Sequence, residues 1–242
     1  NIDATFLKGG LNVVTGVSGA GKTTLVSKVL YENCVLALQE NSSSPFYCKS
    51  FSGLDLFESV ALVNRKPLGF GGGSIPATYL GVFKEIRLLF SSLASAQILG
   101  LQASGFSLRS DVGRCEACKG TGQEVLTMKF LEDSRVECSI CRGRRYKKDV
   151  LSLYYKGKNI SEILDLSIEE TLSFFKNHKK IAEPLKVACD LGLGYLQLGQ
   201  PSSSLSGGEA QRLKLVPYFL KKKVKDHLLI LDEPTRGLHH SD

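Results

Sequence analysis

Two stretches of the chain combine residue types and spacings that suit chemistry on a nucleotide. The first follows the pattern G-x-x-x-x-G-K-[ST], in which backbone amides and a lysine bind phosphates at a helix N-terminus. Lys22 would reach the β- and γ-phosphates, and Thr23 would ligate Mg²⁺. An ordinary glycine-rich turn is the alternative interpretation. The predicted nucleotide contacts of this loop are Gly16, Val17, Ser18, Gly19, Ala20, Gly21, Lys22, Thr23 and Thr24.

The second stretch ends in two adjacent carboxylates, near the C-terminal end of the chain. The apolar run Leu228–Leu231 is typical of a buried parallel strand, and Asp232 and Glu233 follow it directly. Asp232 is expected to hold Mg²⁺ opposite Thr23, which leaves Glu233 as the candidate general base. With Lys22, these carboxylates form the predicted catalytic set. A plain strand end at a turn is the alternative.

Four cysteines have the spacing of a metal site. They follow the form C-x₂-C-x₁₉-C-x₂-C, which is typical of a closed tetrahedral zinc site with a structural role. Two disulfides, or a redox pair, are the alternatives. We prefer zinc because the chain shows no signal peptide, which favours a cytoplasmic protein in which thiols stay reduced. The predicted ligands are Cys115, Cys118, Cys138 and Cys141.

A serine and two glycines begin a predicted helix after Leu205 and form a second candidate anion site. The run Leu205–Arg212, Leu-Ser-Gly-Gly-Glu-Ala-Gln-Arg, resembles the signature motif of the ABC ATPase superfamily. The resemblance implies that the signature of one half contacts ATP held by the phosphate loop of another half, in a homodimer or a tandem protein. ATP and Mg²⁺ are then the expected cofactors. The residues so implied are Ser206, Gly207, Gly208 and Glu209.

Longer blocks resemble the C-terminal ATPase half of the UvrA family of bacterial nucleotide excision repair. This resemblance implies a dimeric ATPase that binds duplex DNA, recognises damage or distortion, and passes the site to UvrB. It implies no nuclease activity, and UvrB would bind only through regions outside this chain. The blocks that carry the resemblance are residues 76–79, 81–83, 113–122, 128–131, 138–146, 155–158, 191–201 and 205–212.

Some positions depart from the family pattern. Arg65 stands where the family has a glutamine beside Mg²⁺ and the attacking water, and it could contact the γ-phosphate instead. Pro217 lies inside the expected signature helix, where it removes a hydrogen bond. These changes leave two alternatives open: a drug-resistance paralogue acting on drug-bound DNA without UvrB, and an ATPase whose zinc lobe binds protein. Because the chain stops before the last strands of an ABC core, we expect a fragment of a larger protein.

The charge distribution agrees with a DNA partner. The chain carries a formal net charge of +7, and residues 113–148 hold nine Lys/Arg against five Asp/Glu. Contacts from such residues to phosphates carry no sequence preference, which suits a sensor of DNA shape. A solvated basic face is the alternative. The candidate DNA contacts are Arg114, Lys119, Arg142, Arg144, Arg145 and Lys147.

These motifs predict an α/β fold, a P-loop ABC-type ATPase core with a mostly helical insertion carrying the four-cysteine zinc module. We expect an ATP-binding region at 1–75, an insertion at 76–200 with the zinc module at about 113–146, and a return to the core at 201–242. No apolar run approaches eighteen residues, so we expect no membrane partner.

Particular elements should position these motifs. A strand at Leu11–Val14 and a helix at Thr23–Leu30 should flank the phosphate loop. Helices are predicted at Ser161–Asp165, Ser167–Lys176 and Ala182–Leu191 from apolar residues at helical spacing. Ser167 and Glu170 should form a capping box.

Overall fold

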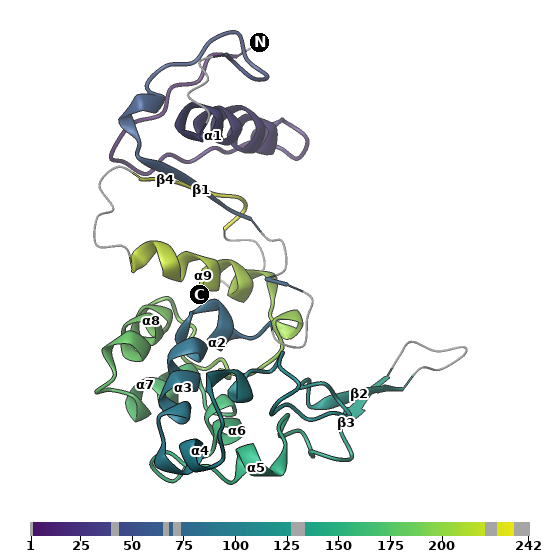
Figure 1. The fold of residues 1–242 in the computed structure, drawn as a ribbon. Coiled ribbons are helices and arrows are strands. Elements are labelled where there is room, and N and C mark those ends of the chain that lie inside the picture. Colours follow the sequence, from purple (N-terminus) through teal and green to yellow (C-terminus); the bar gives the residue numbers. More distant parts are fainter. Residues whose placement is uncertain are drawn as a thin grey trace. The chain divides into compact units, whose positions relative to one another are not determined.

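The computed structural model describes residues 2–39, 44–64, 68–69, 74–126, 134–220 and 227–234, so the predicted nucleotide contact Arg65 lies outside the described residues. The chain forms two compact units (Figure 1). Unit 1 comprises residues 1–65 and 221–242, and unit 2 comprises residues 66–220. Residues 201–220, which hold the signature motif, thus group with unit 2, whereas the sequence-based division joined them to the C-terminal strand.

Unit 1 contains a two-stranded parallel sheet and one long helical segment. Strand β1 (Ser59–Val63) pairs with β4 (His227–Leu231), with Ser59 opposite His227 and Val63 opposite Leu231. The helical segment is a π-helix, η1 (Thr24–Tyr31), that continues into α1 (Glu32–Gln39). A short 3-10 turn, η2 (Leu54–Leu56), precedes β1. The helix predicted after the phosphate loop is confirmed.

The predicted strand before the two carboxylates is confirmed as β4, but the expectation that it is buried is wrong. Ile230 is buried, whereas Leu229 and Leu231 are more than a third exposed. Side chains of a strand alternate between the two faces of a sheet. This alternation indicates that unit 1 covers one face of its sheet and leaves the other accessible.

The strand predicted at Leu11–Val14 does not form. The segment is irregular, and Leu11 and Val13 are 92% and 72% exposed. Apolar residues specify a strand only where neighbouring strands supply a hydrogen-bonded ladder and a surface to pack on. Within the described part of unit 1, the sheet consists of β1 and β4, and residues 11–14 do not join it.

Unit 2 is mostly helical and has its own hydrophobic core, built around Phe90, Phe106, Tyr146 and Phe175. Its two strands form an antiparallel hairpin that projects from the helices (Figure 1). The strands are β2 (Gln123–Leu126) and β3 (Ser134–Glu137), and the 3-10 turns are η3 (Ala103–Phe106) and η4 (Ser202–Ser204). The helices are α2 (Pro76–Tyr79), α3 (Val82–Ser91), α4 (Ala94–Ile98), α5 (Lys148–Leu151), α6 (Ile160–Leu164), α7 (Ile168–Phe174), α8 (Lys179–Asp190) and α9 (Gly207–Phe219).

Local capping signals explain where several helices of unit 2 begin. The predicted capping box of α7 is confirmed: the Glu170 amide donates to Ser167 Oγ at 3.1 Å, and the Ser167 amide donates to Glu170 Oε2 at 2.8 Å. Asn159 and Glu162 form an equivalent box at the start of α6. Within the described part of the chain, every helix is too short or too polar to cross a bilayer.

Candidate functional site

The four predicted metal ligands lie together in unit 2. Their Sγ atoms are all within 4.8 Å of one another, and all four side chains are buried. Sγ of Cys115 lies 3.9 Å from that of Cys138, and Sγ of Cys118 lies 3.6 Å from that of Cys141. A disulfide needs about 2.05 Å, whereas zinc at about 2.3 Å from each sulfur of a tetrahedron separates the sulfurs by about 3.8 Å. The four cysteines are thus free thiols in this structure, and their separations fit a tetrahedral ion better than a pair of disulfides.

Two similar turns shape this cluster. The Gly122 amide donates to Cys118 Sγ at 3.2 Å, and the Arg145 amide donates to Cys141 Sγ at 3.3 Å. Each turn needs positive φ directly after its second cysteine, at Lys119 and Arg142. Burial raises the pKa of the Cys141 thiol, so a bound cation is what would hold it as a thiolate.

Residues after the second turn anchor the cluster to the helical core. The Cys115 amide donates to the Arg145 carbonyl at 2.8 Å, and the Lys147 amide donates to the Gly113 carbonyl at 2.9 Å. The buried Tyr146 hydroxyl donates to the Phe106 carbonyl at 2.9 Å. The cysteine module is therefore continuous with the core of unit 2.

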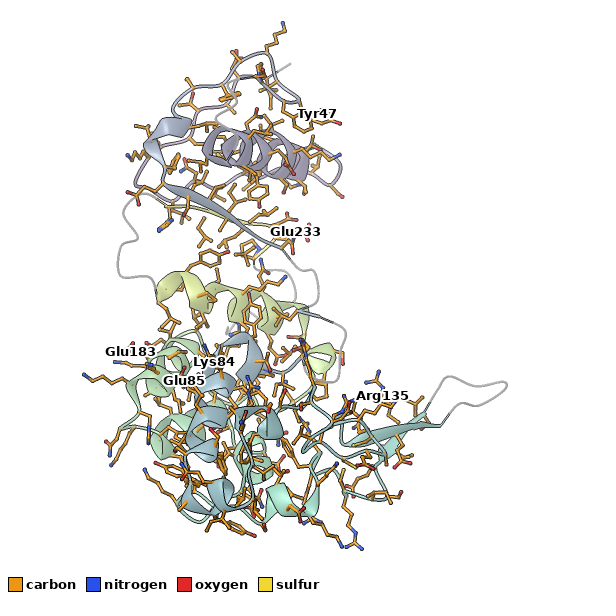
Figure 2. The ribbon with its side chains drawn as sticks, viewed as in Figure 1. Tyr47, Lys84, Glu85, Arg135, Glu183 and Glu233 are labelled. Atoms are coloured by element: carbon orange, nitrogen blue, oxygen red, sulfur yellow. The ribbon has the colours of Figure 1, made fainter. Side chains whose placement is uncertain are left out.

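The candidate DNA contacts divide into two groups. Lys119, Arg142 and Arg144 are exposed. Of these, Arg144 also donates from Nε to the Cys141 carbonyl at 3.2 Å. The other three are more engaged with the protein: Arg114 forms an ion pair with Asp111, Lys147 forms one with Glu116, and Arg145 is half-buried near Asp165. Burial lowers the pKa of Arg145, and the nearby Asp165 opposes that shift. Arg135, which the sequence analysis did not select, is a further exposed cation on β3 (Figure 2).

The phosphate loop of unit 1 is exposed and is held partly by its own lysine. Lys22 Nζ donates to the Gly16 carbonyl at 2.7 Å and to the Val17 carbonyl at 2.8 Å. Gly19 and Gly21 have φ of +80° and +85°, a conformation that side chains disfavour. The lysine ammonium is thus bonded to two carbonyls of its own loop.

The two carboxylates after β4 lie in the same unit as this loop. The Thr23 hydroxyl lies 3.5 Å from Asp232 Oδ1, and the Asp232 amide donates to the Val63 carbonyl of β1 at 3.2 Å. Glu233, labelled in Figure 2, is exposed and has a φ of +47°. Such a conformation costs a non-glycine residue of order 1 kcal/mol or more and is typical of functional sites.

The signature motif begins α9 with a complete capping box. The Glu209 amide donates to Ser206 Oγ at 3.2 Å, and the Ser206 amide donates to Glu209 Oε2 at 2.7 Å. The Tyr195 hydroxyl donates to Glu209 Oε1 at 2.6 Å, a contact that the sequence analysis missed. Burial alone would raise the pKa of Glu209, but these hydrogen bonds outweigh it and lower the pKa. Gly207 is exposed at the N-terminus of this helix.

Several proteins with matching sequences share the name UvrABC system protein A. UvrABC system protein A of Clostridium tetani is 45% identical over 242 residues, which cover 100% of this chain and 26% of that protein. The Bacillus subtilis protein of the same name is 44% identical over 241 residues, covering 100% of this chain and 25% of its own length. Throughout its length, the chain is similar to one region of UvrA. No protein-family model matches it.

A solved structure agrees with the sequence comparison. The crystal structure of UvrA2 from Deinococcus radiodurans superposes with a TM-score of 0.82 at 38% identity, covering 92% of this chain and 26% of the UvrA2 chain. The chain thus has an α/β fold similar to part of UvrA2. It spans about a quarter of the length of the relatives it matches.

Proposed function

We propose that the chain is part of a DNA-repair ATPase of the UvrA kind, which binds ATP and Mg²⁺ and recognises damaged or distorted duplex DNA. The observation that carries this proposal is the 45% identity to UvrABC system protein A, which extends over the whole chain. Identity at this level along the whole chain favours a shared function. In this proposal the protein has no nuclease activity of its own, acts in the cytoplasm, and contacts UvrB through regions outside this chain.

The ATP site would form around the phosphate loop in a P-loop core. Lys22 would exchange its bonds to the Gly16 and Val17 carbonyls for bonds to the β- and γ-phosphates, while the loop amides bind the same oxygens. A hydroxyl and a carboxylate are ligands that Mg²⁺ prefers, and the Thr23 and Asp232 oxygens lie 3.5 Å apart. Glu233 would accept the proton of the attacking water.

A second ATPase half would complete each site, as a homodimer or a tandem protein. The exposed N-terminus of α9 supports this role because the helix dipole and the Gly207 and Gly208 amides favour a phosphate. Ser206 would add a hydroxyl. Both carboxylate oxygens of Glu209 are already hydrogen-bonded, Oε2 to the Ser206 amide of the cap and Oε1 to the Tyr195 hydroxyl, so we assign Glu209 to the turn and not to the nucleotide.

The four cysteines would hold one structural Zn²⁺. The burial and the sulfur separations of the cluster fit a closed tetrahedral site with no position for substrate. The ion would stabilise the two turns that carry the exposed cations Lys119, Arg142 and Arg144. We propose that these three, rather than Arg114, Arg145 and Lys147, make the principal phosphate contacts of this module.

The two alternative functions receive no support from the comparisons. Relatives at 43–45% identity carry the name UvrABC system protein A, and the matching solved structure is a UvrA2. Neither a resistance paralogue nor a protein-binding zinc lobe is needed to explain the described residues.

Fluorescence anisotropy with the full-length protein tests the proposed function. One duplex would be compared with and without a single bulky adduct, with ATP and Mg²⁺, at two salt concentrations. Tighter binding to the adduct, together with ATP turnover, is the expected result. Equal binding to both duplexes would contradict damage recognition, and absent turnover would contradict the ATPase.

A further inference from the structure

A tyrosine hydroxyl from a nearby segment of unit 2 bonds to the signature turn, residues 205–209. Glu209 Oε2 accepts the Ser206 amide at 2.7 Å, as a capping box requires. The other oxygen, Oε1, accepts the Tyr195 hydroxyl at 2.6 Å. A short hydrogen bond to an ionised carboxylate is among the stronger kinds in proteins. The capping box at the start of α7 has no such third member among the described contacts.

Tyr195 belongs to a strap, residues 193–199, that the core of unit 2 holds on two sides. On one side, the Ile168 amide donates to the Leu196 carbonyl at 2.9 Å, and the Gly199 amide donates to the Leu164 carbonyl at 2.7 Å. On the other side, the Ala77 amide donates to the Leu198 carbonyl at 3.0 Å. The strap is therefore a fixed part of unit 2.

Packing reinforces this attachment. Leu193, Leu196 and Leu198 are buried, whereas Tyr195 between them is 62% exposed. A Cβ at Gly199 would lie 2.7 Å from Leu164 Cβ and 2.8 Å from the Leu164 carbonyl oxygen. The strap cannot shift without losing these contacts. The backbone of the exposed Tyr195 is therefore held in place while its hydroxyl bonds to Glu209.

We propose that Tyr195 is a positioning residue for the signature turn, acting through Glu209 on Ser206 and Gly207. The tyrosine buries little surface, so its role in folding is small. Its hydroxyl fixes the orientation of the carboxylate that caps the turn. The proposal rests on the proposed function, in which this turn contacts the γ-phosphate when two ATPase halves close.

Steady-state ATP turnover of the full-length protein carrying Tyr195→Phe tests this inference. We expect kcat to fall about three- to tenfold, as the loss of one hydrogen bond allows. KM for ATP should stay within about twofold, because the phosphate loop of unit 1 supplies most ground-state binding. Tyr154→Phe is the matched control, since Tyr154 is also an exposed tyrosine of unit 2, at 55%. Equal kcat in both variants would overturn the proposal.

A double-mutant cycle separates positioning from a general loss of structure. In a Glu209→Gln background the ionic acceptor is gone, so Tyr195→Phe should cost less than half of its effect on kcat in the parent. Additive effects would place the tyrosine outside the capping network. The melting temperature of Tyr195→Phe should match that of Tyr154→Phe, and a large drop would also overturn the assignment. An inactive parent protein would instead contradict the proposed function.

Discussion

The signature turn and the phosphate loop are both glycine-rich helix starts that suit a phosphate, but they differ in how they are held. The signature turn has a complete capping box and leads into α9, whose Leu213 and Val216 are fully buried. The phosphate loop is exposed, and two of its carbonyls are bonded by Lys22. Unit 2 therefore holds the signature motif with its own core. Unit 1 holds its loop with Lys22, the side chain that the proposed nucleotide would recruit.

Among the tests of this difference, the largest effect is expected from replacing one of the proposed metal ligands of unit 2. Cys138→Ser should abolish stoichiometric zinc and disorder the module around residues 113–147, because zinc binding in such modules supplies on the order of 10 kcal/mol of folding energy. Hydrogen exchange with mass spectrometry would follow each segment, and metal analysis would count zinc. Peptides of η1 and β1 should keep their exchange rates.

Cys189→Ser provides the matched control, since Cys189 is a half-buried thiol outside the cluster. The control should retain its zinc and its exchange pattern. Retention of native exchange in the Cys138→Ser module would contradict a structural metal.

The next largest effect should come from the candidate base of unit 1. Glu233→Gln should lower ATP turnover about 10²- to 10⁴-fold, the usual contribution of general base catalysis, while ATP still binds through Lys22 and the loop amides. Turnover assays and a nucleotide-binding titration would measure the two effects separately. Glu58→Gln, at an exposed carboxylate just before β1, should behave as the parent. Unchanged turnover in Glu233→Gln would remove this residue from the mechanism.

Alanine substitutions at two glycines, one in each unit, would compare how tightly the two units are packed. A Cβ at Gly113 would overlap the Gly105 carbonyl oxygen and lie 2.8 Å from Val150 Cγ2, whereas one at Gly10 would have Leu7 Cβ as its nearest neighbour at 4.0 Å. Neither residue has positive φ, so steric contact decides the outcome. Gly113→Ala should lower the free energy of unfolding by about 1–3 kcal/mol, and Gly10→Ala by less than about 0.5 kcal/mol. Denaturant unfolding would measure both, and equal values would contradict the contrast in packing.

The sequence predicted what depends on local signals. The spacing of Cys115, Cys118, Cys138 and Cys141 predicted one cluster, and Ser167 with Glu170 predicted a helix start; both are confirmed. The capping box arises within four residues, and the cysteine cluster arises from two short turns of similar sequence. The nucleotide and DNA roles of particular residues stay predictions.

Features that depend on distant partners were missed. The strand expected at Leu11–Val14 was wrong, because apolar alternation says nothing about whether a neighbouring strand is present. The hydrogen bond from Tyr195 to Glu209 joins residues that are fourteen apart in sequence. It depends on how the strap folds, which local sequence signals do not specify. The division of the basic residues into exposed and internally bound groups also depends on tertiary contacts with Asp111, Glu116 and Asp165.

The smallest effect concerns DNA binding, in which the exposed cations of the cysteine module should matter more than its half-buried or ion-paired ones. Replacing both Arg142 and Arg144 with Gln should lower the slope of log affinity against log salt by about 1.8, the contribution of two phosphates of B-DNA. Affinity should fall alike for all duplex sequences, since phosphate contacts carry no sequence information. Anisotropy titrations of the full-length protein at several salt concentrations would measure both quantities.

A control with the same loss of charge sharpens this last prediction. Lys84 and Lys179 are exposed on α3 and α8, away from the cysteine turns in sequence, and their replacement by Gln also removes two positive charges. The control should change the salt slope by less than half as much, because long-range attraction is screened beyond about 8–10 Å at physiological salt. Equal slopes in the two double variants would mean that the overall charge of unit 2 attracts DNA. The exposed arginines beside the cysteines would then be a solvated face of the cysteine module.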